Sequence, residues 1–261
     1  MTVDQIMQQA KLLLNESKLK EAKILFLNIL QIQPTHYKAH TNLGAILLKL
    51  GKLDEAEVSF KKAIEFKPEF AVAHYNLGVT QEKLNRFNEA EISYKKAIEY
   101  KTDYVEAHTN LGAILLKLGK LDEAEVSFKK AIEFKPEFAV AHYNLGVTQE
   151  KLNRFNEAEI SYKKAIEYKT DYVEAHNNLN MILRQNKLLL KIEQAKNSEK
   201  KIKVSNLDTD ISLATNPFIS KRNVEIELLD ELYKINSVEL DKTRDIRYGN
   251  GRCSDYELFE N

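Results

Sequence analysis

The sequence predicts an all-α fold, an α-solenoid built from stacked helix-turn-helix repeats. The first observation is a duplication, because residues 39–108 are identical to residues 107–176. The second is a looser similarity within this 68-residue segment, which recurs every 34 residues. The third is that each 34-residue unit holds two apolar stripes with helical spacing. Periods of this length indicate a solenoid, in which stacked helix pairs bury faces that no pair could bury alone.

The unit from Tyr37 to Phe70 illustrates the predicted helix pair. Gly51 and Lys52 interrupt the helical pattern, and Pro68 ends the second helix because proline lacks a backbone donor. Apolar residues recur at steps of three and four on both sides of this turn. The first stripe is Ala39, Leu43, Leu47 and Leu50, and the second is Leu53, Ala56, Phe60, Ala63 and Ile64.

Small residues occupy fixed positions in these predicted helices. A glycine lies in the middle of four first helices, although glycine costs about 1 kcal/mol there relative to alanine. An aromatic residue recurs in each partner helix, so we expect large residues to fill the space beside glycine. The glycines are Gly44, Gly78, Gly112 and Gly146, and the aromatics are Phe60, Tyr94, Phe128 and Tyr162.

These positions resemble the tetratricopeptide repeat family. The motif is carried by Leu43, Gly44, Ala56, Phe60, Ala63 and Pro68, and the next three units repeat it with Thr102 and Thr170 in place of two prolines. The unit at residues 3–36 matches less well. The resemblance covers about residues 3–186. It implies a right-handed superhelix whose first helices line a concave groove for a peptide or partner protein.

The predicted domain organisation follows the repeats. A repeat array covers residues 1–196, with units at about 3–36, 37–70, 71–104, 105–138 and 139–172, and a capping helix from residue 173. A polar linker follows at 197–222, and a C-terminal segment at 223–261 has one helix and then irregular structure. This tail resembles the connector before an oxoglutarate- and iron-dependent oxygenase-like domain in bacterial repeat proteins. No histidine follows His176, so the tail cannot supply the two histidines of such an iron site.

The candidate binding residues lie on the side of the first helices opposite their apolar stripe. Asparagine recurs there once per unit. Its side-chain amide can donate and accept together, so a row of asparagines can bind the backbone of an extended peptide. The alternative is that asparagine belongs to the repeat pattern and bonds locally between helices. The five residues are Asn42, Asn76, Asn110, Asn144 and Asn178.

Other recurring residues receive a more ordinary interpretation. Beside the asparagines, Tyr75 and Tyr143 stand at the position that Thr41 and Thr109 occupy in the alternate units. The two tyrosines are either rigid anchors for a ligand or ordinary half-exposed residues. Five histidines share one repeat position, which favours packing over metal binding. The second helices carry Glu–Lys pairs four residues apart, which are typical of a solvated surface.

Composition restricts the function further. Lys plus Arg equals Asp plus Glu at 39 each, which disfavours binding to nucleic acid or to a membrane surface. With a single cysteine and no apolar span or signal peptide, we expect a cytoplasmic location. No cofactor or metal site is expected.

The sequence thus predicts a non-catalytic protein-interaction module. The alternatives are the targeting arm or a fragment of a larger enzyme, a glycosyltransferase or an oxygenase, and self-association through the array ends.

Overall fold

The computed structural model describes residues 1–197, and within them all regular structure is α-helical. The helices form pairs of 13 and 14 residues, as the 34-residue period requires. They are α1 Val3–Asn15, α2 Leu19–Ile32, α3 Tyr37–Lys49, α4 Leu53–Phe66, α5 Ala71–Lys83, α6 Phe87–Tyr100, α7 Val105–Lys117, α8 Leu121–Phe134, α9 Ala139–Lys151, α10 Phe155–Tyr168 and α11 Val173–Asn197.

Two compact units divide the chain, residues 1–180 and residues 181–261. The first unit contains the five helix pairs and the beginning of α11. The second contains the remainder of α11, through residue 197. The predicted linker and C-terminal segment, residues 197–261, lie outside the described residues from position 198 onward. The helix predicted in the C-terminal segment and the resemblance of that segment to an oxygenase connector fall there too.

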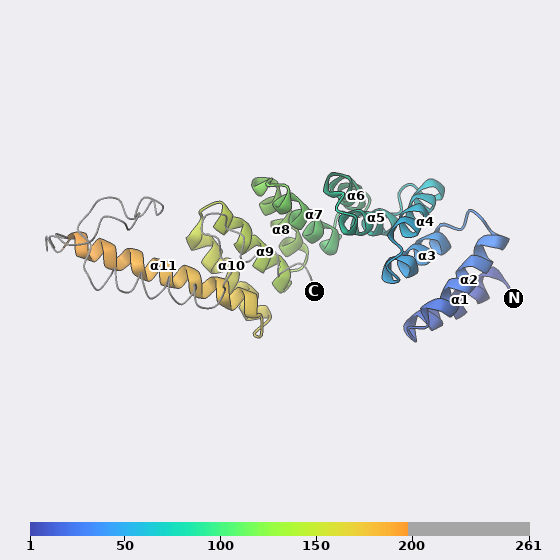
Figure 1. Cartoon of the computed structure of the whole chain (residues 1–261), viewed down its shortest axis with the longest axis horizontal. Coiled ribbons are helices and arrows are strands. Elements are labelled where there is room, and N and C mark those ends of the chain that lie inside the picture. Colours follow the sequence, from blue (N-terminus) through green and yellow to red (C-terminus); the bar gives the residue numbers. More distant parts are fainter. Residues whose placement is uncertain (198–261) are drawn as a thin grey trace, which may run out of the picture. The chain divides into compact units, whose positions relative to one another are not determined.

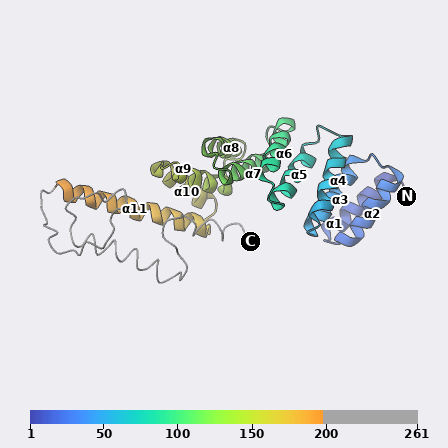
Figure 2. The ribbon, with the colours of Figure 1, turned by 45° about the horizontal axis from the view of Figure 1, so that its top comes forward.

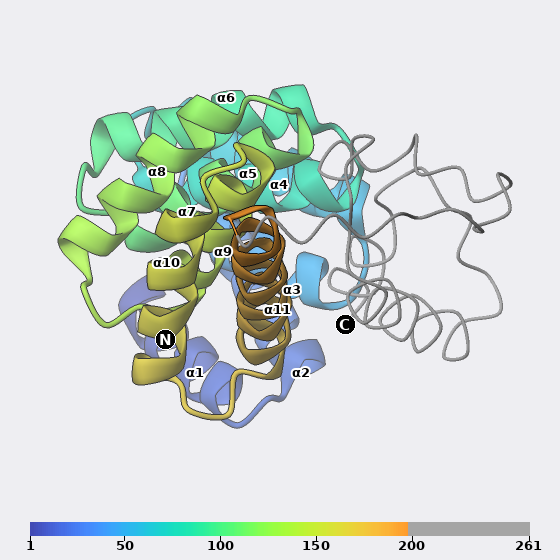
Figure 3. The same cartoon turned by 90° about the vertical axis from the view of Figure 1, so that its left-hand side faces the viewer.

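The first unit is a solenoid, because each helix contacts its partner and the next pair in chain order. Figures 1 and 2 show the pairs α1–α2 through α9–α10 stacked in sequence. The first helices of successive repeats also contact one another, α3 with α5 and α7 with α9. In the end-on view of Figure 3, α5, α7 and α9 lie closer to the middle of the array than α6, α8 and α10. The predicted all-α solenoid is thereby confirmed.

One residue in each turn between paired helices has a left-handed backbone. Gly51 and Gly119 have φ values of 73° and 75°, a conformation that glycine adopts without steric cost. Asn85 and Asn153 take the same place in the alternate units, with φ of 58° and 60°. Asparagine is one of the few other residues that tolerate this region. The alternation of Gly and Asn therefore leaves the turn unchanged.

The recurring histidines fix the loop that precedes each first helix. The Nε2 of His74 donates to the Pro68 carbonyl at 2.7 Å, six residues earlier. The same bond recurs with distances of 2.8–2.9 Å in the other units, also where threonine replaces proline at the acceptor. Each imidazole therefore satisfies a loop carbonyl, which agrees with the packing role expected from the sequence.

The core confirms the predicted pairing of glycine with an aromatic ring. A Cβ added to Gly44 would lie 2.7 Å from Phe60 Cε1, and one added to Gly78 would lie 2.7 Å from Tyr94 Cε1. Both rings are fully buried. Leu77 and Leu145, the core leucines beside two of these glycines, are each 7% exposed. Glycine thus lets the paired helices approach closely enough to bury the ring between them.

Candidate functional site

One side of each first helix contributes no fully buried residue to the core. Residues at i, i+4, i+7 and i+11 lie within about 60° of one another on a helix. All of these residues are exposed or half-buried, and we call their side the first-helix face. It comprises Lys38, Asn42, Ala45 and Lys49 in α3, Val72, Asn76, Val79 and Lys83 in α5, Glu106, Asn110, Ala113 and Lys117 in α7, Val140, Asn144, Val147 and Lys151 in α9, and Glu174 and Asn178 in α11.

The five asparagines all lie on this face and are half-buried, but their amides are engaged differently. Asn110 donates through Nδ2 to the hydroxyl of Tyr75 at 3.2 Å, with a longer contact of 3.4 Å to that of Tyr94. Asn178 donates to the Tyr162 hydroxyl at 3.1 Å. Asn42 donates to a carbonyl of its own helix at 2.8 Å. These three amides therefore have structural partners.

Asn76 and Asn144 differ, because within residues 1–191 their side-chain amides take part in no hydrogen bond. The cause lies in the preceding repeat, where Thr41 occupies the position of Tyr75 and Phe60 the position of Tyr94. The ring packed before Asn110 is Tyr94, whereas the ring packed before Asn76 is Phe60, which has no hydroxyl to accept a bond. Asn144 follows Phe128 in the same way. Because Phe and Tyr alternate at this position, the side-chain amides of Asn76 and Asn144 remain available to bond a ligand.

The two tyrosines proposed as anchors pack within the array. Tyr75 is half-buried between Tyr94 and Tyr104, with ring centroids 5.9 and 4.9 Å away. Burial raises the pKa of Tyr75, and it raises the pKa of Tyr104 to about 12. Tyr143 packs in the same way against Tyr162 and Tyr172 and is only 6% exposed. Each of the two rings thus packs against two tyrosines of its own repeat.

Lysines form one edge of the first-helix face, near the C-terminal ends of the first helices. Lys117 forms an ion pair of 3.0 Å with Glu82 of the preceding first helix. Glu82 also accepts a hydrogen bond of 3.1 Å from the buried Tyr94 hydroxyl. Lys49 and Lys83 occupy the same repeat position as Lys117 and are exposed.

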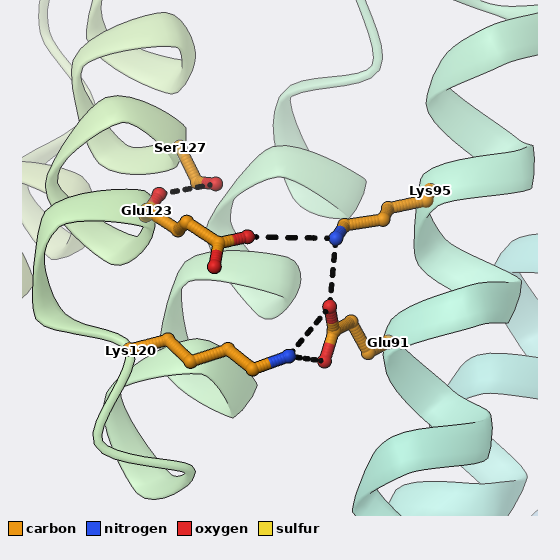
Figure 4. A network of polar contacts seen from close by, with 5 residues as sticks. All are labelled: Glu91, Lys95, Lys120, Glu123 and Ser127. Atoms are coloured by element: carbon orange, nitrogen blue, oxygen red, sulfur yellow. Dashed lines mark hydrogen bonds and ion pairs between the residues drawn. The ribbon is translucent and has the colours of Figure 1, made fainter.

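On the second helices, the Glu–Lys pairs are more than a solvated surface, and that interpretation is wrong for the glutamates. Glu91 is 7% exposed and binds Lys95 of its own helix at 2.7 Å and Lys120 of the next repeat at 2.8 Å (Figure 4). Glu57 and Glu125 bind Arg86 and Arg154 of the next repeat in the same way. These carboxylates connect successive repeats.

The described part of the chain has neither a metal-binding cluster nor a membrane-spanning helix. Residues 1–191 contain no cluster of three or more His, Cys, Asp or Glu side chains that could hold a metal ion. No helix in that range is long and apolar enough to cross a membrane.

Family models match the repeat region. A tetratricopeptide repeat model matches residues 37–70, 105–138 and 139–172, a second matches 59–92, and a TPR repeat model matches 83–119. Together they cover residues 37–172, more than half of the chain. The chain carries tetratricopeptide repeats. The family resemblance of the array is confirmed, and these repeats fit a protein-interaction module.

Solved tetratricopeptide structures share this fold. YrrB, described as a TPR protein with an unusual peptide-binding site, is 27% identical over 66% of this chain and 89% of its own, with a TM-score of 0.58. MamA is 25% identical over 62% of this chain and 94% of its own, with a TM-score of 0.58. PilF of Pseudomonas aeruginosa is similar in fold alone. It is 21% identical over 76% of this chain and 84% of its own, with a TM-score of 0.61. Comparison with curated proteins gave no significant match.

Proposed function

We propose that the chain is a protein-interaction module that binds an extended segment of a partner protein along the first-helix face. The observation that carries this proposal is the state of Asn76 and Asn144. Each holds a half-buried amide that forms no hydrogen bond within residues 1–191, although Asn110 and Asn178 at the same repeat position do. Half-buried polar groups of this kind gain from a partner. The peptide-binding site named for YrrB, a protein of similar fold, supports the same conclusion.

Geometry favours an extended ligand. Asn76 and Asn144 are two repeats apart, and neighbouring packed helices lie about 8–10 Å apart. The two amides are therefore separated by about 16–20 Å, the rise of about six residues of an extended peptide. Side chains of an extended peptide alternate with a period of two, so residues about six apart present the same edge. One peptide strand can thus meet both amides with equivalent backbone groups.

The test compares two pairs of asparagines in the same array. Asn76→Ala with Asn144→Ala should leave the free energy of unfolding nearly unchanged and weaken peptide binding about 5- to 150-fold, since each hydrogen bond contributes about 0.5–1.5 kcal/mol. Asn110→Ala with Asn178→Ala should instead lower stability by about 1–3 kcal/mol, because tyrosine hydroxyls lose their partner. Circular dichroism melts report the fold.

Binding is measured with peptides selected from a random twelve-residue library against the wild-type protein and then titrated by fluorescence anisotropy. Truncation of a selected peptide to about four residues should abolish the sensitivity to one of the two asparagines, because that length spans only about 13 Å. A wild-type protein that selects no peptide, or a folded Asn76/Asn144 variant that binds with full affinity, would contradict the proposal.

A further inference from the structure

The charge of the first-helix face is unbalanced over α3 and α5. Helix α3 contains no acidic residue, and α5 contains only Glu82. Glu82 is already bound to Lys117 and to the Tyr94 hydroxyl. Lys49 and Lys83 are exposed, and within residues 1–191 neither forms an ion pair. This part of the face therefore presents positive charge without a compensating carboxylate.

The internal duplication shows why these lysines differ from Lys117. Lys49 and Lys117 are copies within identical 68-residue segments, so their local sequence is the same. The partner of Lys117 is 35 residues earlier, in the preceding repeat. The residue 35 positions before Lys49 is Leu14, and the one before Lys83 is Leu48. A leucine cannot pair with a lysine, so the charge of Lys49 and Lys83 remains available.

We propose that the part of the ligand that lies along α3 and α5 is acidic, an extended peptide whose Asp or Glu side chains contact Lys49 and Lys83. This inference rests on the proposed function, and it names the chemistry of the partner that the asparagines cannot specify. A side-chain amide binds backbone regardless of sequence, whereas a lysine selects carboxylates. Lys83 lies seven residues after Asn76 on the same side of α5, about 10 Å along the helix axis, a gap that a lysine and a glutamate side chain can span together.

The experiment uses three synthetic nine-residue peptides that differ only at alternate positions, which hold Glu, Gln or Lys. Fluorescence anisotropy is recorded with the full chain at about 0.02 M and about 0.5 M salt. The Glu peptide should bind about tenfold more tightly than the Gln peptide at low salt, and the Lys peptide more weakly than either. The advantage of Glu should largely disappear at high salt, where the screening length is only a few ångströms.

Charge-neutralising variants locate the effect. Lys49→Gln with Lys83→Gln should remove the preference for Glu peptides, so that the Glu and Gln peptides bind with equal affinity. The matched control is Lys20→Gln with Lys62→Gln, two exposed lysines of the second helices α2 and α4, which removes the same charge from elsewhere in the array. The control should retain the tenfold preference, and melts should show both variants folded.

The outcomes separate the two proposals. Equal binding of the Glu and Gln peptides, or an equal loss in the control variant, would overturn the acidic-ligand inference and leave the proposed function standing. Failure of all three peptides and of the selected library peptides to bind would overturn the proposed function and this inference with it.

Discussion

The most constrained residues of the array are the glycines in the middle of the first helices. In an isolated helix, replacing Gly78 by alanine would stabilise the helix by about 1 kcal/mol. In the folded repeat, the new Cβ would lie 2.7 Å from Cε1 and 2.8 Å from Cδ1 of Tyr94. That ring is fully buried between two helices and cannot move aside without displacing them. Packing therefore reverses the sign expected from helix propensity.

We predict that Gly78→Ala destabilises the protein by about 1–3 kcal/mol, the usual cost of overfilling a packed site. Urea unfolding followed by circular dichroism measures the change. In a Tyr94→Leu background, the same substitution should become neutral or stabilising, because the clashing ring atoms are absent. This double-mutant cycle isolates the contact. A Gly78→Ala variant more stable than wild type would show that the ring does not limit helix approach.

At the scale of helices, the buried glutamates connect one second helix to the next. Burial alone would raise the pKa of Glu91, but its bonds to Lys120 and Lys95 outweigh burial and lower that pKa below 4.5. Each bridge between repeats joins a buried glutamate to a cation 29 residues later. The pairs are Glu57–Arg86, Glu91–Lys120 and Glu125–Arg154. After Glu159, which binds Lys163 of its own helix, the residue 29 positions later is Leu188. No Arg or Lys therefore occupies the bridging position after Glu159.

We predict that Glu91→Gln lowers the free energy of unfolding by about 1–2 kcal/mol at neutral pH. Glutamine keeps the shape but loses the charge-assisted part of the hydrogen bonds to Lys95 and Lys120, and the exposed lysine ends reduce the effect. Glu99→Gln, which alters an exposed ion pair with Lys96, is the control and should cost less. Because the folded-state pKa of Glu91 is depressed, its contribution is complete above the unfolded value of 4.5 and is lost as pH falls through the folded value.

Urea titrations at neutral pH and at about pH 3 measure this dependence for both variants and wild type. The difference between wild type and Glu91→Gln should shrink in acid, as protonation removes the charge of Glu91 that glutamine lacks. A difference that stays constant over this range would argue that shape, and not charge, holds the repeats together.

At the scale of the whole array, stability should be a sum of repeats and of contacts between neighbours. The duplication permits a test without any new interface. Deletion of residues 71–138 joins Phe70 to Ala139 and restores the sequence found around Phe138 and Ala139. Every remaining repeat then keeps a neighbour that it already has in the full chain.

We predict that this deletion variant folds with the same kind of helices, has a smaller urea dependence of the unfolding free energy, and is less stable than the full chain. The urea slope falls because less surface is exposed on unfolding. It should also bind peptides more weakly, since it retains Asn144 but not Asn76. An unfolded variant, or one of unchanged stability and slope, would contradict the nearest-neighbour description.

The sequence alone determined the repeat period, the helix pairs, the turn positions and the pairing of glycine with an aromatic ring. These features depend on residues within one 34-residue unit, where spacing is set by helix geometry. It also placed the five asparagines on one side of the first helices. Whether Tyr75 and Tyr143 point to a ligand or pack internally was left open, and the structure stacks both against neighbouring tyrosines.

Only the tertiary structure decided which of these repeated residues are engaged. Asn76 and Asn110 have the same role in the sequence pattern, but the preceding repeat offers Phe60 to one and Tyr94 to the other. Lys49 and Lys117 are identical copies, but only Lys117 has a glutamate 35 residues earlier. The physical reason is that hydrogen bonds and ion pairs act over a few ångströms. Stacking therefore selects partners 16, 29 or 35 residues away, which local sequence periodicity does not specify.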